Sequence, residues 1–258
     1  MAKALVTGAA RRLGREMALY LARRGHDVAV HCNTAAGEAE ATAAEIRALG
    51  RRAEVLVADL LDEDQTQALV GRAAEALGGP LDVLVNSASI FEYDNFGTAT
   101  RESWDRHVGS NLRAPFVLTQ AFARQAPKAG TVDGQPVARA LIVNMVDQRV
   151  LKPTPEFTTY SIAKAGLWWL TQTAAQGLAP DIRVNAIGPG PTMRGARQSE
   201  DHFARQRAAT ILERGPDPDE ICAALGYFLD AKSVTGQLIC VDGGQHLGWR
   251  TPDVLGPE

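Results

Sequence analysis

The chain has 258 residues, with 27 basic and 30 acidic side chains and a formal net charge of −3 at pH 7. This near-balance gives no support to binding of nucleic acid or of an anionic membrane surface, so a small molecule is the expected ligand. No apolar run approaches the roughly 20 residues that a membrane-spanning helix needs. A strand-like segment follows Met1 directly, without a signal peptide, so we expect a cytoplasmic protein.

Cysteine and histidine are too scattered to predict a disulfide framework or a metal site. Cys32, Cys222 and Cys240 are odd in number and far apart, and the five histidines show no HxH or HxxxH pairing. We therefore expect reduced, buried thiols and no bound metal.

Short apolar segments alternate along the chain with segments of helical periodicity. The apolar segments span residues 3–6, 27–32, 53–60, 81–88, 140–146, 182–188 and 237–243. Each is apolar on both faces, as strands are when helices cover both sides of a sheet. Since no linker or repeat interrupts the pattern, it predicts one α/β domain over residues 1–258. We expect a Rossmann-type, doubly wound, seven-stranded parallel sheet with helices on both faces.

Two polar, glycine-containing stretches are predicted as loops, at 128–139 and at 189–201. The second follows the carboxyl end of a predicted strand, where open α/β sheets bind ligands. We therefore expect a substrate lid over residues 189–210, and a C-terminal tail over residues 245–258.

The first predicted strand leads into the glycine turn TGAARRLG at residues 7–14. A helix follows, because Met17, Ala18, Leu21 and Ala22 recur at helical spacing. Such a helix directs free N–H groups at an anion, while Gly8 and Gly14 allow close approach of a ligand. A purely structural turn is the alternative, and a nucleotide phosphate is the ligand that this arrangement predicts.

The second strand ends in VHCNT, without the acidic residue that holds the ribose 2′-hydroxyl in NAD enzymes. His31, Asn33 and Thr34 can donate hydrogen bonds there and Arg11 adds positive charge, which favours NADP(H) over NAD(H). After the third strand, Asp59 can accept from the adenine amino group while the Leu60 N–H meets the ring. A helix N-cap is the equal alternative for Asp59.

The stretch TYSIAK places Tyr160 and Lys164 on one face of a helix. A lysine beside a phenol favours the phenolate, so we expect Lys164 to lower the pKa of Tyr160 toward the operating pH. Asp147 lies thirteen residues before the tyrosine, at the end of a predicted strand.

These motifs together resemble the short-chain dehydrogenase/reductase family over nearly the whole chain: TGAARRLG resembles TGxxxGxG, NSAS (86–89) resembles NNAG, and YSIAK resembles YxxxK. PGP (189–191), Asn111 and VTGQLICVDGG also match the family. The resemblance implies a proton relay of Asn111, Tyr160 and Lys164. Tyr160 would be the acid, Lys164 would hold the nicotinamide ribose, and Asn111 would position a relay water. It also implies that NADP(H) lies against Gly8, Arg11, Arg12, Leu13, Gly14, Asn86, Ser87, Ala88, Pro189, Gly190 and Thr192, as well as Tyr160 and Lys164.

Three departures from the family pattern resemble its pteridine-reductase branch. Arg12 stands at the usual glycine, Asp147 at the usual carbonyl-binding serine, and Phe91 follows NSAS. The branch implies that Arg12 touches both cofactor phosphate and pterin, that Phe91 stacks on the pterin, and that Ser89 contacts it. The alternatives are core packing for Phe91 and a helix cap or loop turn for Asp147.

Elementary chemistry favours the same substrate class. An ionised aspartate repels a developing alkoxide, whereas a pterin offers N–H groups and takes its proton on nitrogen. We therefore expect NADPH-dependent reduction of a pterin C=N bond, with Tyr160 and Asp147 acting together. A 3-oxoacyl or sugar carbonyl reductase and a non-catalytic NADP-binding regulator are the alternatives.

The helix expected at 160–179 is apolar nearly all round, and its adjacent Trp168 and Trp169 point about 100° apart. A single domain offers no second layer outside this helix. Because the family pairs this helix across a two-fold axis, we expect a homotetramer, with a dimer as the alternative. The other explanation is that loop 189–201 covers the second tryptophan.

Overall fold

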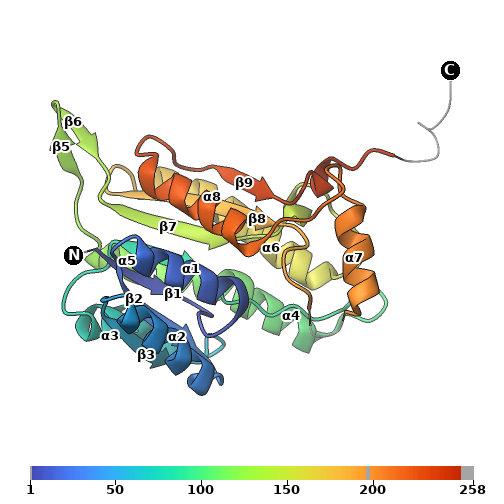
Figure 1. Cartoon of the computed structure of the whole chain (residues 1–258), viewed down its shortest axis with the longest axis horizontal. Coiled ribbons are helices and arrows are strands. Elements are labelled where there is room, and N and C mark those ends of the chain that lie inside the picture. The colour runs from blue at the N-terminus through green and yellow to red at the C-terminus, as the bar shows by residue number, and fades with distance from the viewer. Residues whose placement is uncertain (1, 196–197, 251–258) are drawn as a thin grey trace.

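The computed structural model describes residues 2–195 and 198–250, and its centre is one parallel sheet. The strands are β1 (Lys3–Val6), β2 (Asp27–Cys32), β3 (Ala53–Val57), β4 (Val83–Asn86), β7 (Ala140–Met145), β8 (Ile182–Pro189) and β9 (Leu238–Val241). They lie in the order β3-β2-β1-β4-β7-β8-β9, and every pairing is parallel (Figure 1). The predicted Rossmann-type sheet is confirmed.

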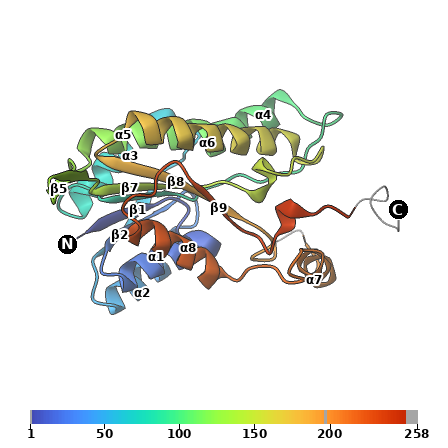
Figure 2. The ribbon, with the colours of Figure 1, turned by 90° about the horizontal axis from the view of Figure 1, so that it is seen from above.

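Helices cover both faces of the sheet, as Figure 2 shows. One layer contains α1 (Arg12–Arg23), α2 (Ala36–Ala48) and α8 (Pro218–Asp230). The other contains α3 (Glu63–Ala76), α4 (Arg101–Val108), α5 (Ala114–Gln125) and α6 (Thr158–Gly177). The segment after β8 carries α7 (Glu200–Ala208), which lies beyond the carboxyl ends of the strands (Figure 1). None of the helices that the structure describes is long and apolar enough to cross a membrane.

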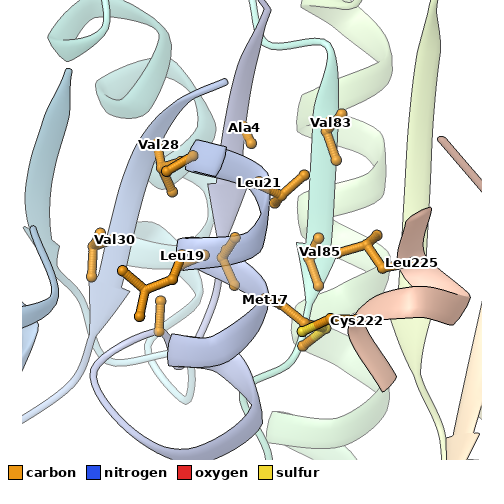
Figure 3. Packing of buried hydrophobic residues seen from close by; sticks show 14 of the residues in the cluster. Ala4, Met17, Leu19, Leu21, Val28, Val30, Val83, Val85, Cys222 and Leu225 are labelled. Carbon is orange, nitrogen blue, oxygen red and sulfur yellow. The ribbon is translucent and has the colours of Figure 1, made fainter. Parts of the chain in front are cut away.

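The amphipathic pattern of the first helix explains how this layer is fixed to the sheet. Met17 and Leu21 on α1 are fully buried against the strands. Figure 3 shows their side chains between the valines of β2 and β4, beside Cys222 and Leu225 of α8. Burying a side chain of this size contributes about 1.5–3 kcal/mol, so this contact holds the glycine turn that precedes α1 in place.

Residues 128–139 were predicted as a loop, and this prediction was wrong. They contain a β-hairpin of β5 (Gly130–Val132) and β6 (Gln135–Val137), which projects from the end of the molecule opposite α7 (Figure 1). Asp133 and Gly134 form its two-residue turn with φ of 50° and 77°. Positive φ at both turn residues matches the twist of paired antiparallel strands, and Asp-Gly favours it.

The strand order predicts a ligand crevice beside β1. The chain moves outward from β1 through β2 to β3, then returns to pair β4 on the other side of β1. In sheets of this topology, ligands bind at the carboxyl ends of the strands where the order reverses. The candidate site is therefore built by the segments that follow β1, β4, β7 and β8.

Candidate active site

The glycine turn after β1 is a packing requirement as well as a ligand cradle. A Cβ on Gly8, whose φ is +66°, would lie 2.9 Å from the Cα of Ala88. A Cβ on Gly14 would lie 2.2 Å from the carbonyl oxygen of Gly8. The Thr7 hydroxyl accepts hydrogen bonds from the N–H groups of Ser87 and Ala88, at 2.9 and 3.0 Å. These close contacts and hydrogen bonds therefore hold the glycine turn against the segment that follows β4.

Arg12 occupies the left-handed region, with φ +54°. This explains why glycine is usual at the position, since a side chain there costs about 1 kcal/mol or more. The guanidinium donates to the carbonyl oxygens of Arg194 at 2.7 Å and Met193 at 3.0 Å. Arg12 therefore connects the phosphate turn with the loop that follows β8.

The residues after β2 leave free donors for a 2′-phosphate. Asn33 and Thr34 are exposed, and their side chains make no hydrogen bond within the described ranges. Arg11 forms a 2.8 Å ion pair with Glu38, and both side chains are exposed. A phosphate arriving here would compete with Glu38 for this arginine.

His31 does not lie as predicted. Its ring is buried, Nδ1 accepts from the Gly8 N–H at 3.1 Å, and Nε2 donates to the Ala58 carbonyl at 3.1 Å. Burial lowers the pKa of His31 to about 4, so the ring is neutral at pH 7. Both nitrogens are engaged by backbone groups, and His31 fixes the glycine turn to the end of β3 instead of donating to a phosphate.

The alternative N-cap assignment for Asp59 is wrong, because Asp62 caps α3 by accepting from the Gln65 N–H. One Asp59 carboxylate oxygen accepts from the Leu61 N–H at 3.0 Å. The Leu60 N–H makes no hydrogen bond with any described residue. These two groups remain available for an adenine ring.

The other residues predicted to bind the cofactor lie beside the same crevice. The buried Asn86 side chain donates to Asn144 at 2.8 Å, while its own amide oxygen has no partner among the described residues. Gly190, which follows β8, lies so close to Asp242 that a Cβ on Gly190 would be 2.6 Å from the Cα of Asp242. The Thr192 hydroxyl donates to the Gly190 carbonyl at 3.1 Å. Pro189 ends β8, and Leu13 packs against the core beneath the turn.

Asp147 and Tyr160 form the chemical centre. The phenol donates to one carboxylate oxygen of Asp147 at 2.9 Å, and the other oxygen accepts from the Arg149 N–H at 2.9 Å. Asp147 therefore also caps a short 3₁₀ helix, Gln148–Val150, as the alternative interpretation required. Burial raises the pKa of Asp147, and burial followed by the Asp147 charge raises the pKa of Tyr160 well above 10. The phenol therefore keeps its proton at neutral pH and donates it to Asp147 in this hydrogen bond.

Lys164 does not act on Tyr160 as predicted. Its ammonium donates to the Met145 carbonyl at 2.7 Å and lies 5.7 Å from the Tyr160 ring centroid. Burial lowers the pKa of Lys164 to about 8. The expected lowering of the Tyr160 pKa is not found, because burial and Asp147 dominate and raise it.

Asn111 lies in a π-helical turn, Gly109–Arg113, between α4 and α5. Turns of this kind are rare and concentrate at functional sites. The amide nitrogen donates to the Ile90 carbonyl at 2.9 Å, and the buried amide oxygen has no partner among the described residues. That oxygen is a free acceptor for a relay water.

An aromatic wall stands beside Tyr160, and sequence analysis found only part of it. Phe91, 44% exposed, stacks on Phe157 with ring centroids 4.4 Å apart and meets Tyr160 edge-on at 4.7 Å. The Arg149 guanidinium carbon lies 4.8 Å from the Phe157 centroid and 6.0 Å from that of Phe91. The Ser89 hydroxyl lies close enough to the phenol to hydrogen-bond it, which lowers the Tyr160 pKa slightly. No motif signals Phe157 or Arg149.

Comparison with known proteins agrees with this geometry. A family model described as short chain dehydrogenase matches residues 2–204. The chain belongs to the short-chain dehydrogenase/reductase family. It is 35% identical to L-rhamnose 1-dehydrogenase (NAD(P)(+)) of Azotobacter vinelandii, over 93% of this chain and 94% of the relative. It is 31% identical to the 3-oxoacyl-[acyl-carrier-protein] reductase FabG of Staphylococcus aureus, over 95% of this chain and 98% of the relative.

The crystal structure of FolM alternative dihydrofolate reductase 1 from Brucella suis, in complex with NADP, is similar to the whole chain. The identity is 42%, the TM-score is 0.91, and 98% of each chain is covered. The crevice described above fits the same cofactor, through the glycine cradle, the free donors Asn33 and Thr34, and the unpaired N–H of Leu60. The protein is an NADP-binding oxidoreductase of this family.

A buried polar network lies at the start of α6, next to Tyr160. The Thr159 hydroxyl donates to the Asp94 carboxylate and lies 2.7 Å from Nδ1 of His107, while Nε2 of His107 accepts from the Glu92 N–H at 3.1 Å. Asp94 also accepts from the Thr159 N–H at 3.1 Å and, through its carbonyl, from Phe157 at 2.7 Å. It thereby caps α6 from another part of the chain. The sequence carries no signal for this network, because its members come from three separate segments.

Proposed function

We propose that the protein reduces the C=N bond of a pterin with NADPH. The observation that carries the proposal is the Tyr160–Asp147 hydrogen bond of 2.9 Å beside the exposed ring of Phe91. NADPH supplies a hydride to the substrate carbon when it is bound. The carboxylate of Asp147 can accept from pterin N–H groups but cannot donate to an alkoxide, so the pair suits protonation of nitrogen.

The proton path uses groups of this chain. Tyr160, kept protonated by its raised pKa, donates its phenolic proton to the ring nitrogen and is left as a phenolate, while the Asp147 carboxylate accepts from a pterin N–H. In this proposal Lys164, whose ammonium donates to the Met145 carbonyl, also holds the nicotinamide ribose. The amide oxygen of Asn111, which has no partner among the described residues, holds a water that returns a proton to Tyr160. Phe91 supplies a flat face on which a heterocycle stacks, and Ser89 a polar contact at its edge.

The remaining cofactor contacts are assigned to the donors and acceptors that surround the crevice. Asn33, Thr34 and Arg11 bind the 2′-phosphate. Asp59 and the Leu60 N–H bind the adenine ring. Arg12 contacts both a cofactor phosphate and the pterin. Residues 189–210 act as a lid, which Arg12 already reaches through two carbonyl groups. Residues 196–197 of this lid and 251–258 of the tail lie outside the described residues.

The test is turnover of a panel of 7,8-dihydropterins and of acetoacetyl thioesters with NADPH, by the wild type and by Asp147→Ser. We expect the wild type to reduce pterins. We expect Asp147→Ser to lose about a hundredfold or more of that activity while it still binds NADPH. Thioester reduction without pterin reduction would make the protein a carbonyl reductase, as its FabG and sugar-dehydrogenase relatives are named. NADPH binding without turnover would make it a regulator.

We also propose that the protein assembles as a homotetramer through α6. Trp168 packs partly into the core, while Trp169 is 69% exposed and Ile162 on the same helix is 45% exposed. No described part of loop 189–201 covers Trp169, and an exposed apolar stripe of this kind is typical of an interface. Light scattering at micromolar concentration tests this. A dimeric mass would support pairing through α6 but not the tetramer. A monomeric mass would contradict the proposal.

A further inference from the structure

Arg149 lies beside the aromatic wall of the candidate active site. Its guanidinium lies beside the stacked rings of Phe91 and Phe157 and forms no ion pair with any described residue. Its one side-chain hydrogen bond is a long one, 3.3 Å, to the carbonyl oxygen of Glu156. Most of the donors of a half-buried cation therefore remain available to a ligand.

The backbone fixes this cation next to the reacting bond. The Arg149 N–H donates to one oxygen of Asp147, whose other oxygen accepts from Tyr160. In a 7,8-dihydropterin the C=N bond joins N5 to C6, and C6 carries the side chain of the heterocycle. When this bond lies against Tyr160, the side chain begins at the atom that is being reduced. The group that contacts the side chain must therefore lie close to the Tyr160–Asp147 pair, as Arg149 does.

We propose that Arg149 selects pterins that carry a carboxylate at or next to C6. A guanidinium binds a carboxylate through two parallel hydrogen bonds, and neighbouring aromatic faces exclude the water that would weaken them. The reaction leaves this tail unchanged: hydride adds to C6, a proton adds to N5, and the C=N bond becomes a single bond. The inference rests on the proposed pterin reduction and names its substrate class.

Arg149 has a second effect that an experiment must separate from selection. Its positive charge lowers the pKa of both Asp147 and Tyr160. This influence changes the chemical step for every substrate by the same factor. The ratio of kcat/KM values for two pterins that differ only in their tails cancels it, and reports recognition of the tail alone.

The experiment measures kcat/KM for 7,8-dihydropterin-6-carboxylate, whose tail is a carboxylate bonded to C6, and for 7,8-dihydrobiopterin, whose tail is uncharged. We expect Arg149→Met to lower the ratio of the first value to the second by about tenfold, and Arg149→Lys to restore part of it. Arg149→Gln keeps hydrogen-bond donors but loses the charge, and we expect it to lower the ratio as well. Arg139→Met, which removes an exposed arginine before β7 at the far end of the sheet, is the control and should leave the ratio unchanged.

The outcomes distinguish the two proposals. If the wild type reduces both pterins and the ratio in Arg149→Met and in Arg149→Gln equals the wild-type ratio, selection by Arg149 is wrong and pterin reduction stands. If the wild type reduces neither pterin, both proposals are wrong. If Arg139→Met lowers the ratio as much as Arg149→Met does, the effect is one of overall charge, and selection by Arg149 is again wrong.

Discussion

The two halves of the crevice are built from different parts of the polypeptide. On the nucleotide side, backbone groups set the shape, through the contact of Gly8 with Ala88 and the His31 ring that bridges two turns. On the substrate side, the surface consists of side chains, and Phe91, Phe157 and Arg149 belong to separate segments of the chain. A backbone surface fits one cofactor and tolerates few changes, whereas a side-chain surface can be altered residue by residue. The difference predicts where mutations alter substrate and where they alter cofactor.

The largest effect is expected at the boundary of the two halves, from Tyr160→Phe. Removing the phenol deletes the proton donor and its 2.9 Å hydrogen bond to Asp147 without changing the ring that meets Phe91. We expect kcat to fall about a hundredfold or more, with the Kd for NADPH within about twofold of wild type. Stopped-flow reduction and fluorescence titration measure the two quantities. Retention of most of kcat would show that Tyr160 is not the acid.

On the nucleotide side, Asn33→Asp should change the cofactor and not the substrate. The new carboxylate would repel a 2′-phosphate and can accept from a ribose 2′-hydroxyl. We expect the preference for NADPH over NADH to fall roughly thirtyfold, about 2 kcal/mol, with an unchanged KM for the pterin. Asn33→Ala, which removes the donor without adding charge, is the control and should have a much smaller effect. Equal effects of the two variants would place the phosphate elsewhere.

The residues that shape the turn of the nucleotide half can be located in the sequence because their determinants are local. A strand, a glycine turn and a helix are consecutive, so Gly8, Gly14 and Asp59 can be located from spacing alone. Even there, the side chain of His31 was assigned wrongly, since its direction depends on where β3 lies. Alternation along a strand predicts the face of the sheet on which a side chain lies, but not the group to which that side chain hydrogen-bonds.

The substrate half is predicted only where a residue belongs to a motif. Tyr160, Lys164 and Phe91 were found in this way. Phe157 and the Asp94–Thr159–His107 network were missed, because their contacts join positions up to 65 residues apart. The pKa of Tyr160 was also predicted in the wrong direction, because the pair YxxxK gives the lysine charge but not the burial that outweighs it. Burial of this kind is a property of the packed molecule.

The buried network should matter to the substrate half alone. Thr159→Val keeps the shape of the side chain and removes the hydroxyl between Asp94 and His107. We expect a loss of about 1–3 kcal/mol in the free energy of unfolding, and a fall in kcat of about tenfold with an unchanged Kd for NADPH. Thr173→Val, on the exposed side of the same helix, is the matched control. If both variants behave alike, the network does not position Tyr160.

Raising the pH should weaken cofactor binding through Lys164. Its native pKa is about 8 against 10.5 in the unfolded chain, so the folded protein loses this ammonium first. Between these values the unfolded state binds more protons, and the contribution of Lys164 to the free energy of unfolding therefore rises with pH. The charge that would hold the nicotinamide ribose is lost over the same range. We expect the Kd for NADPH to increase about fivefold from pH 7 to pH 9; a constant Kd would assign the ribose to another group.

The smallest effect, and the one that tests the division most directly, is expected from Arg12→Gly, because Arg12 belongs to both halves. Glycine relieves the strain of φ +54° but deletes the hydrogen bonds to Met193 and Arg194. The turn itself stays intact, since glycine is the commoner residue at this position. We expect the Kd for NADPH to change by less than about twofold and the KM for the pterin to rise about threefold to fivefold. Unchanged kinetics in both measurements would make Arg12 purely structural. A larger effect on NADPH than on the pterin would place Arg12 in the nucleotide half alone, and would leave the loop after β8 without a link to the phosphate turn.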